Sequence, residues 1–140
     1  MANDEVWVER LNGVNQDRLP GMIGMKVTHA EKGLMRARMP VTQALVAPIG
    51  FLFAPSIVAL ADTLCAYGTV LPEGASNFTT AELKCNFMST VRDGVVLCEA
   101  KLLHGGRTTQ VWDAIITAEA TGKLMAAFRC TQIILWPKGA

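Results

Sequence analysis

The sequence has few charged and few aromatic residues. Of its 140 residues, 18% are charged and 6% are aromatic, and the net charge is +1. No block of basic residues occurs, so the broad positive face that nucleic-acid binding needs is absent. Hydrophobic residues make up 51%, more than the surface of an ordinary monomer requires. We therefore expect a single domain over residues 1–140, with part of its surface buried against other copies of the chain.

Closely spaced cysteines are also missing. The four cysteines, Cys65, Cys85, Cys98 and Cys130, form no C-x-x-C pair, and each lies in an apolar stretch. This pattern predicts reduced core residues rather than a metal site or disulfides, and it suits a reducing compartment. The charged start of the chain, MANDEVWVERL, lacks the apolar segment of a signal peptide. We expect a cytoplasmic protein without a metal or a cofactor.

The longest apolar stretch, residues 41–71, is interrupted by prolines, a glycine, a glutamine and one acid. A membrane span would need ~20 cleaner residues, so none is predicted. The acid is Asp62, the one charged residue between Met39 and Pro72. An ionised carboxylate among small apolar side chains is costly unless it is paired or used. Asp62 is therefore a candidate functional residue, and the alternative is an acid satisfied by a nearby Thr or backbone group.

Asp62 lies within a predicted helix over about residues 55–70. Pro55 suits the first helical position, and the alanines and leucines that follow favour a helix. A second, short helix is predicted within residues 1–18, with Asn3 as its cap. Six alternating runs predict strands: 25–31, 34–41, 78–88, 95–104, 107–119 and 124–135.

Short turns between these runs predict an antiparallel meander. The fold class is therefore α+β, with a long sheet wrapped around one apolar helix. In the run 78–88, strict alternation places Leu83 and Cys85 on one face and Thr80 and Glu82 on the other.

Four stretches, in this order, resemble a known family: LPGMIGMKV, PIGFLFAPSIVALADTLCAYG, AELKCNFMSTVRDG and HGGRTTQVWDAIITAEATGKLMAAFRCTQIIL. The sequence resembles the hotdog-fold acyl-CoA thioesterases of the PaaI/YdiI-like group over about residues 19–135. The resemblance implies a curved antiparallel sheet wrapped around a central helix. It also implies dimers whose sheets join, assembled into homotetramers, with active sites at the dimer interface.

The resemblance also assigns catalytic roles. Asp62 aligns with the family's helix carboxylate, which attacks the thioester carbonyl or activates water for that attack. The family's HGG loop, which comes just before the helix, is replaced by Phe53-Ala54-Pro55. Ala54 keeps a backbone N–H that can polarise the thioester carbonyl, whereas Pro55 has none.

Substrate binding is assigned to two segments. The run His104, Gly105, Gly106, Arg107 and Thr108 resembles the family's turn that meets CoA, since glycines admit close backbone approach and Arg pairs with phosphate. The alternative for this run is an ordinary Gly-Gly hairpin turn with a solvated Arg. The aromatic residues that precede the helix, Phe51 and Phe53, are the candidates for contact with the acyl group.

The resulting prediction is hydrolysis of an acyl-CoA, or a related thioester, to a free acid and a thiol. Two alternatives stay open. One is a non-catalytic acyl-CoA-binding hotdog protein, because several polar residues of the family's site are replaced. The other is a hotdog dehydratase or hydratase, whose chemistry needs a His paired with the helix acid.

Overall fold

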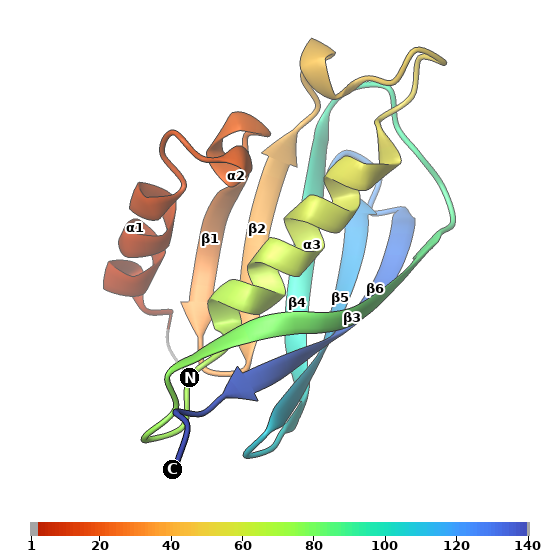
Figure 1. Ribbon diagram of the computed structural model, residues 1–140. Coiled ribbons are helices and arrows are strands. Elements are labelled where there is room, and N and C mark those ends of the chain that lie inside the picture. Colours follow the sequence, from red (N-terminus) through yellow and green to blue (C-terminus); the bar gives the residue numbers. More distant parts are fainter. Residues whose placement is uncertain (1–2, 140) are drawn as a thin grey trace.

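A computed structural model describes residues 3–139. Six strands form one antiparallel sheet that curves around the long helix α3, while α1 and the short α2 lie beside β1 (Figure 1). The predicted α+β class, with a sheet wrapped around a central helix, is confirmed. The helices are α1 (Glu5–Val14), α2 (Leu19–Met22), η1 (Gln43–Leu45) and α3 (Ala54–Gly68). The strands are β1 (Lys26–Glu31), β2 (Leu34–Pro40), β3 (Asn77–Phe87), β4 (Val95–Gly105), β5 (Thr109–Ala118) and β6 (Leu124–Leu135).

The order of the strands in the sheet corrects the predicted meander. The order is β1-β2-β4-β5-β6-β3, so β3 pairs with β6 rather than with its sequence neighbour β4. The chain leaves β2, runs through α3 across the concave face, and returns along the far edge as β3. The predicted short turn between β3 and β4 is instead a connection over residues 88–94 that leads from the far edge of the sheet back to a place beside β2, because the α3 crossover has already carried the chain to that edge.

The cap of α1 also differs from the prediction. Asp4, not Asn3, is the N-cap, and its carboxylate accepts a hydrogen bond from the Trp7 N–H at 2.9 Å. The Asn3 carboxamide instead accepts the N–H of Ala30 on β1 at 2.8 Å. Both residue types suit a cap, and the contact with β1 decides between them.

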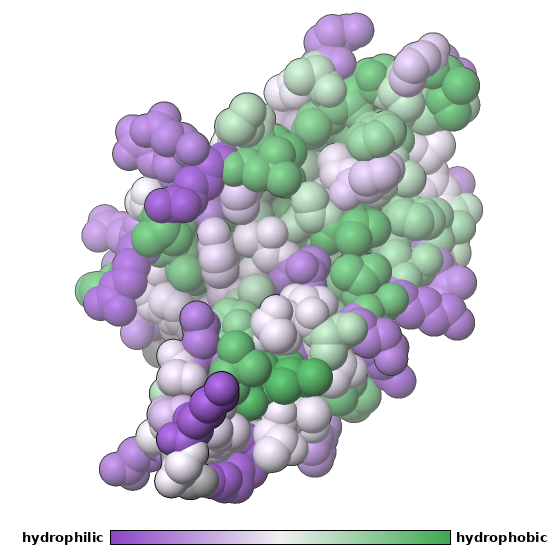
Figure 2. Space-filling model, viewed as in Figure 1, coloured by the Kyte–Doolittle hydropathy of each residue, from purple (hydrophilic) through white to green (hydrophobic). Residues whose placement is uncertain are grey.

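Strand β3 forms one edge of the sheet and is covered little by the rest of the chain. It has a neighbouring strand on one side only, and most of its side chains are exposed. Leu83 is 40% exposed and Phe87 is 48% exposed. Figure 2, drawn from the same side as Figure 1, shows hydrophobic atoms gathered over the region of α3 and β3, whereas hydrophilic atoms prevail over α1.

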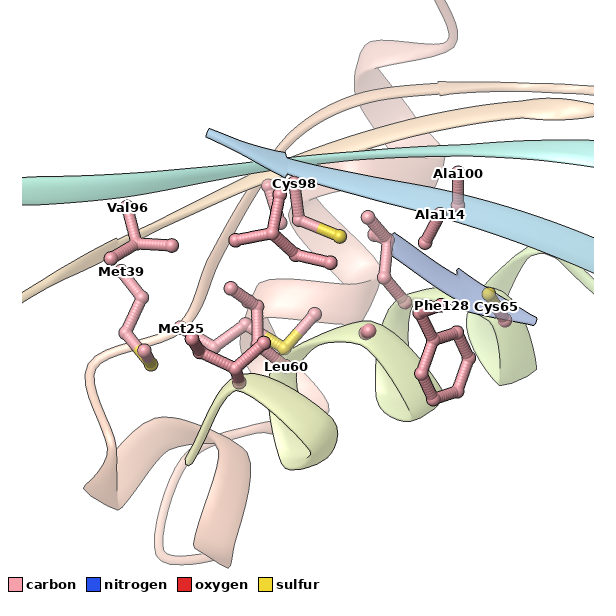
Figure 3. Packing of buried hydrophobic residues seen from close by; sticks show 14 of the residues in the cluster. Met25, Met39, Leu60, Cys65, Val96, Cys98, Ala100, Ala114 and Phe128 are labelled. Atoms are coloured by element: carbon pink, nitrogen blue, oxygen red, sulfur yellow. The ribbon is translucent and has the colours of Figure 1, made fainter. Parts of the chain in front are cut away.

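The core lies between α3 and the concave face of the sheet. Leu60 and Cys65 point from α3 toward side chains of β4, β5 and β6, such as Ala114 and Phe128 (Figure 3). Full burial of each large apolar side chain contributes about 1.5–3 kcal/mol. Three of the four cysteines are buried here, and all four are free thiols, as predicted from their spacing.

Gly68, the last residue of α3, lies directly against side chains of β2 and β5. A Cβ at this position would lie 2.5 Å from Cη2 of Trp112 and 2.9 Å from Cγ of Met35. Only glycine admits this approach without displacement of its neighbours. The helix ends at Gly68, two residues before position 70, where the predicted helix of about 55–70 ended.

A β-bulge in β3 changes which side chains face α3. Thr80 pairs with Gln132 and Glu82 pairs with Thr131, so Ala81 is an extra residue with no partner. Thr80 therefore lies on the concave face with Leu83 and Cys85. The alternation-based placement of Thr80 beside Glu82 was wrong, because one inserted residue reverses the phase of all positions before it.

Candidate active site

Asp62 lies in the middle of α3 and is half-buried. Its Oδ1 accepts a hydrogen bond from Oγ1 of Thr80 at 2.9 Å. Asp62 thus has the nearby Thr partner that the alternative interpretation, an acid satisfied by a Thr or a backbone group, predicted. The bulge of β3 supplies this partner, because it turns Thr80 toward the helix. A half-buried carboxylate held by one hydroxyl is a suitable base or nucleophile.

Gln132 lies behind Thr80 and is fully buried. Its Oε1 is 3.1 Å from Oγ1 of Thr80, and its Nε2 is 3.5 Å from Sγ of Cys130. Cys65, one turn after Asp62, is hydrogen-bonded to Cys130; this bond, and then burial, raise the pKa of the Cys65 thiol. Sequence reasoning missed Gln132, although a lone amide among the inward positions of an apolar strand was an available signal.

The N-terminus of α3 presents a free backbone donor. Ala54 is the first helical residue and is exposed, and within residues 3–139 its N–H donates to no other group. The helix dipole adds partial positive charge at this end. Ala54 precedes Asp62 by eight residues, which is about 12 Å along the helix axis. Because a thioester carbonyl is far smaller than this separation, the two groups of one chain cannot both contact it.

The two aromatic candidates lie at the same end of α3. Phe51 stacks under the guanidinium of Arg92, whose Cζ is 4.4 Å from the ring centroid. Phe53, the N-cap of α3, is 50% exposed. Both residues come just before Ala54, at the N-terminal end of α3.

The predicted CoA-binding run forms the hairpin between β4 and β5, near the C-terminal end of α3. Gly105 and Gly106 line a cavity of about 330 Å³ together with Gly68. The guanidinium of Arg107 stacks on Trp136, with Cζ 4.0 Å from the ring centroid, and the Trp136 indole donates to the Arg107 carbonyl at 3.2 Å. The Gly-Gly hairpin is therefore present, and its Arg is stacked rather than freely solvated.

The other two members of that run are exposed on the same hairpin. The Thr108 carbonyl accepts the N–H of Ile134 at 2.9 Å, and Nε2 of His104 lies close to Gly106. No group of three or more His, Cys, Asp or Glu side chains that could hold a metal occurs in the described part of the chain. None of its helices is long and apolar enough to cross a membrane.

The sequence and the fold of this chain are similar to those of known thioesterases. The family model described as Thioesterase superfamily matches residues 49–125, which include all of α3 and β3. A 1,4-dihydroxy-2-naphthoyl-CoA hydrolase of Escherichia coli is 29% identical over 132 residues, covering 94% of this chain and 96% of the relative. The proofreading thioesterase EntH of Klebsiella pneumoniae is 30% identical, covering 82% and 85%.

Solved structures agree with this. A mutant thioesterase from Pseudomonas aeruginosa has a TM-score of 0.86 at 26% identity, covering 91% of this chain and 93% of that chain. A thioesterase from Haemophilus influenzae has a TM-score of 0.83 at 28% identity, covering 95% and 94%. The chain belongs to the thioesterase superfamily and has the hotdog fold. Its reaction class is thioester hydrolysis. The comparisons therefore favour the predicted hydrolase over the binding-only protein and over the dehydratase.

Proposed function

We propose that this protein hydrolyses acyl-CoA thioesters with Asp62 as general base or nucleophile. The observation that carries the proposal is the half-buried Asp62 carboxylate held at 2.9 Å by Thr80 on the lightly covered edge strand. As a base, Asp62 takes a proton from water while the water oxygen bonds to the thioester carbon. As a nucleophile, it first forms a mixed anhydride that water then opens. In both routes the C–S bond breaks and the CoA thiolate leaves.

The active site is proposed to need two copies of the chain. Within one copy, Ala54 lies about 12 Å from Asp62 along the helix axis. A partner chain that pairs along β3 would bring its own Ala54 N–H, with Phe51 and Phe53, toward this Asp62. The open edge of β3 and the exposed Leu83 and Phe87 support such pairing. The Ala54 N–H would then stabilise the negative charge that develops on the carbonyl oxygen.

The CoA moiety is proposed to lie against His104, Gly105, Gly106, Arg107 and Thr108. Arg107 supplies the positive charge for a phosphate, and the stack on Trp136 holds its guanidinium in place. The glycines leave the backbone open to close approach.

Assembly of dimers into homotetramers is also proposed. On the convex face of the sheet, cavities of about 630 and 460 Å³ share the exposed Ile115, and such a lining supports a second interface. A cytoplasmic location is part of the proposal as well, and the free cysteines support it.

The test is thiol release from a panel of aryl and aliphatic acyl-CoAs. Aryl substrates belong in it because one relative is named a naphthoyl-CoA hydrolase. Asp62→Asn is expected to lower kcat by at least about 10³-fold, since the amide is neither a base nor a nucleophile. Glu9→Gln, which neutralises an exposed acid on α1, is the matched control and should keep full activity.

Equal turnover by Asp62→Asn and the wild type would overturn the role of Asp62. Binding of acyl-CoAs without turnover of any of them would overturn the proposed reaction. A single turnover in ¹⁸O-labelled water tests for the nucleophilic route. Water that opens the anhydride at the Asp62 carboxyl carbon leaves label in Asp62, whereas water that attacks the acyl carbon labels the product acid, as in the general-base route; label in Asp62 therefore establishes the nucleophilic route.

A further inference from the structure

Gln132 is a buried polar residue that the proposed reaction does not use. The desolvation of a side-chain amide is costly unless its hydrogen bonds are restored. Its cross-strand neighbour Gln110 is also buried, but Gln110 has structural partners: its Nε2 donates to the Val70 carbonyl at 3.0 Å, and its Oε1 accepts from the Trp112 indole at 3.4 Å. Gln132 contacts Thr80 and Cys130 instead. The two glutamines lie on the same face of the sheet and differ in their hydrogen-bond partners.

The count of protons around Thr80 fixes the direction of its hydrogen bonds. Its hydroxyl has one proton and lies 2.9 Å from Asp62 Oδ1 and 3.1 Å from Gln132 Oε1. An ionised carboxylate is the stronger acceptor, so the proton goes to Asp62. Gln132 Oε1 would then face a lone pair of Thr80 with no proton between them. A half-turn of the amide, whose two ends have the same shape, places Nε2 against Thr80 and removes this conflict.

The same half-turn places Gln132 Oε1 against the Cys130 thiol, a weak S–H donor. Cys65 is hydrogen-bonded to Cys130 and keeps its proton. Every group then donates to the next one, from Cys65 through Cys130, Gln132 and Thr80 to Asp62. The chain of donors starts and ends on α3, one helical turn apart, and passes through β6 and β3.

We propose that Gln132 is a positioning residue that keeps the Thr80 hydroxyl donating to Asp62. It acts through Thr80 and does not touch the substrate. The inference rests on the proposed role of Asp62. A fixed donor at 2.9 Å holds the Asp62 carboxylate in one rotamer, which keeps its reacting oxygen in place.

The first experiment compares Gln132→Met with Gln110→Met as a matched control. Methionine keeps the length and volume of the side chain and removes its hydrogen bonds. Gln132→Met is expected to lower kcat about five- to tenfold, the value of one hydrogen bond, with KM within about twofold. Gln110→Met should keep the wild-type kcat, although it also loses stability.

Wild-type kcat in Gln132→Met would overturn the proposal, and so would an equal loss in Gln110→Met, which would indicate packing alone. The Thr80→Val background adds a second criterion. If Gln132 acts through Thr80, Gln132→Met should add no further loss there. A full, additive loss would overturn the inference.

Asp62→Asn separates this inference from the proposed function. A fully active Asp62→Asn refutes the catalytic carboxylate, whereas an inactive Asp62→Asn together with an unchanged Gln132→Met refutes only the positioning role.

The infrared S–H stretch of Cys130 provides a readout without activity. The band is assigned by its loss in Cys130→Ala. It should show a hydrogen-bonded thiol in the wild type and a free thiol in Gln132→Met. Cys130→Ser, which keeps a donor, should retain wild-type kcat, whereas Cys130→Ala should lose part of it. A free thiol in the wild type would overturn the donor chain.

Discussion

The two edges of the sheet are finished in different ways. At β1, the Asn12 carboxamide accepts the Val27 N–H at 2.8 Å and donates to the Val27 carbonyl at 2.9 Å. The Ala30 carbonyl accepts the N–H of Asp4 at 2.8 Å, next to the Asn3 contact. At β3, by contrast, no strand or helix of residues 3–139 pairs with the outer side. The β1 edge is closed by its own chain, and the β3 edge is open within the described residues.

The difference has a consequence for function. Unpaired edges invite association, and natural proteins close those that they do not use. The open edge carries the Thr80 partner of Asp62, and the closed edge carries no candidate site residue. Closure of β1 leaves β3 as the edge that is open to the proposed pairing with a second chain.

The largest effect is expected from a charge at the open edge. Leu83→Glu places a carboxylate on the concave side of β3, where the proposed partner lies. The burial of an unpaired charge is costly, so the variant should be monomeric and should lose at least about 100-fold in activity. Analytical ultracentrifugation and thiol release measure the two effects. Val6→Glu, on α1 beside the closed edge, is the control, and a dimeric, active Leu83→Glu would contradict the comparison.

An intermediate effect is expected at the closed edge. Asn12→Ala leaves the N–H and the carbonyl of Val27 without their partner, which should cost about 1–3 kcal/mol of unfolding free energy. Urea denaturation measures the loss, and activity below the transition should be unchanged. Gln16→Ala, an exposed amide after α1, is the matched control. If Asn12→Ala were as stable as this control, the amide would not be what closes the edge.

The smallest effect is expected between the edges, on the convex face. Arg129 Nη2 donates to Asp113 Oδ2 at 2.8 Å, and this hydrogen bond lowers the pKa of Asp113. The stabilisation is therefore full above the pKa of an unfolded Asp, about 3.9, and is lost as pH falls through the lower folded value. Because the pair is exposed, Asp113→Asn should cost under about 1 kcal/mol at pH 7 and almost nothing near pH 2. If the loss of unfolding free energy in Asp113→Asn were the same at all pH values, it would arise from packing and not from the ion pair.

Particular residues show which features of the fold and of the site could be predicted from the sequence. Isolation of Asp62 in an apolar stretch located the helix carboxylate, and alternation gave β6 its observed bounds, Leu124–Leu135. Thr80 was predicted on the wrong face, because the alternation rule assumes a regular strand and takes no account of an inserted residue. The lone amide of Gln132 in an apolar strand was visible in the sequence, but its contact with Thr80 was not, because Thr80 lies on a strand that is distant in sequence.

The sequence by itself determined the class of fold, the central helix and its acid, because periodicity and helix signals are local properties of the chain. Only the tertiary structure decided which strand lies beside β3, where the bulge falls, and which hydroxyl meets Asp62. Those features follow from pairing between β3 and β6, whose register is set by packing against α3. Because β3 and β6 are far apart in sequence, the local sequence of either strand does not determine the register between them.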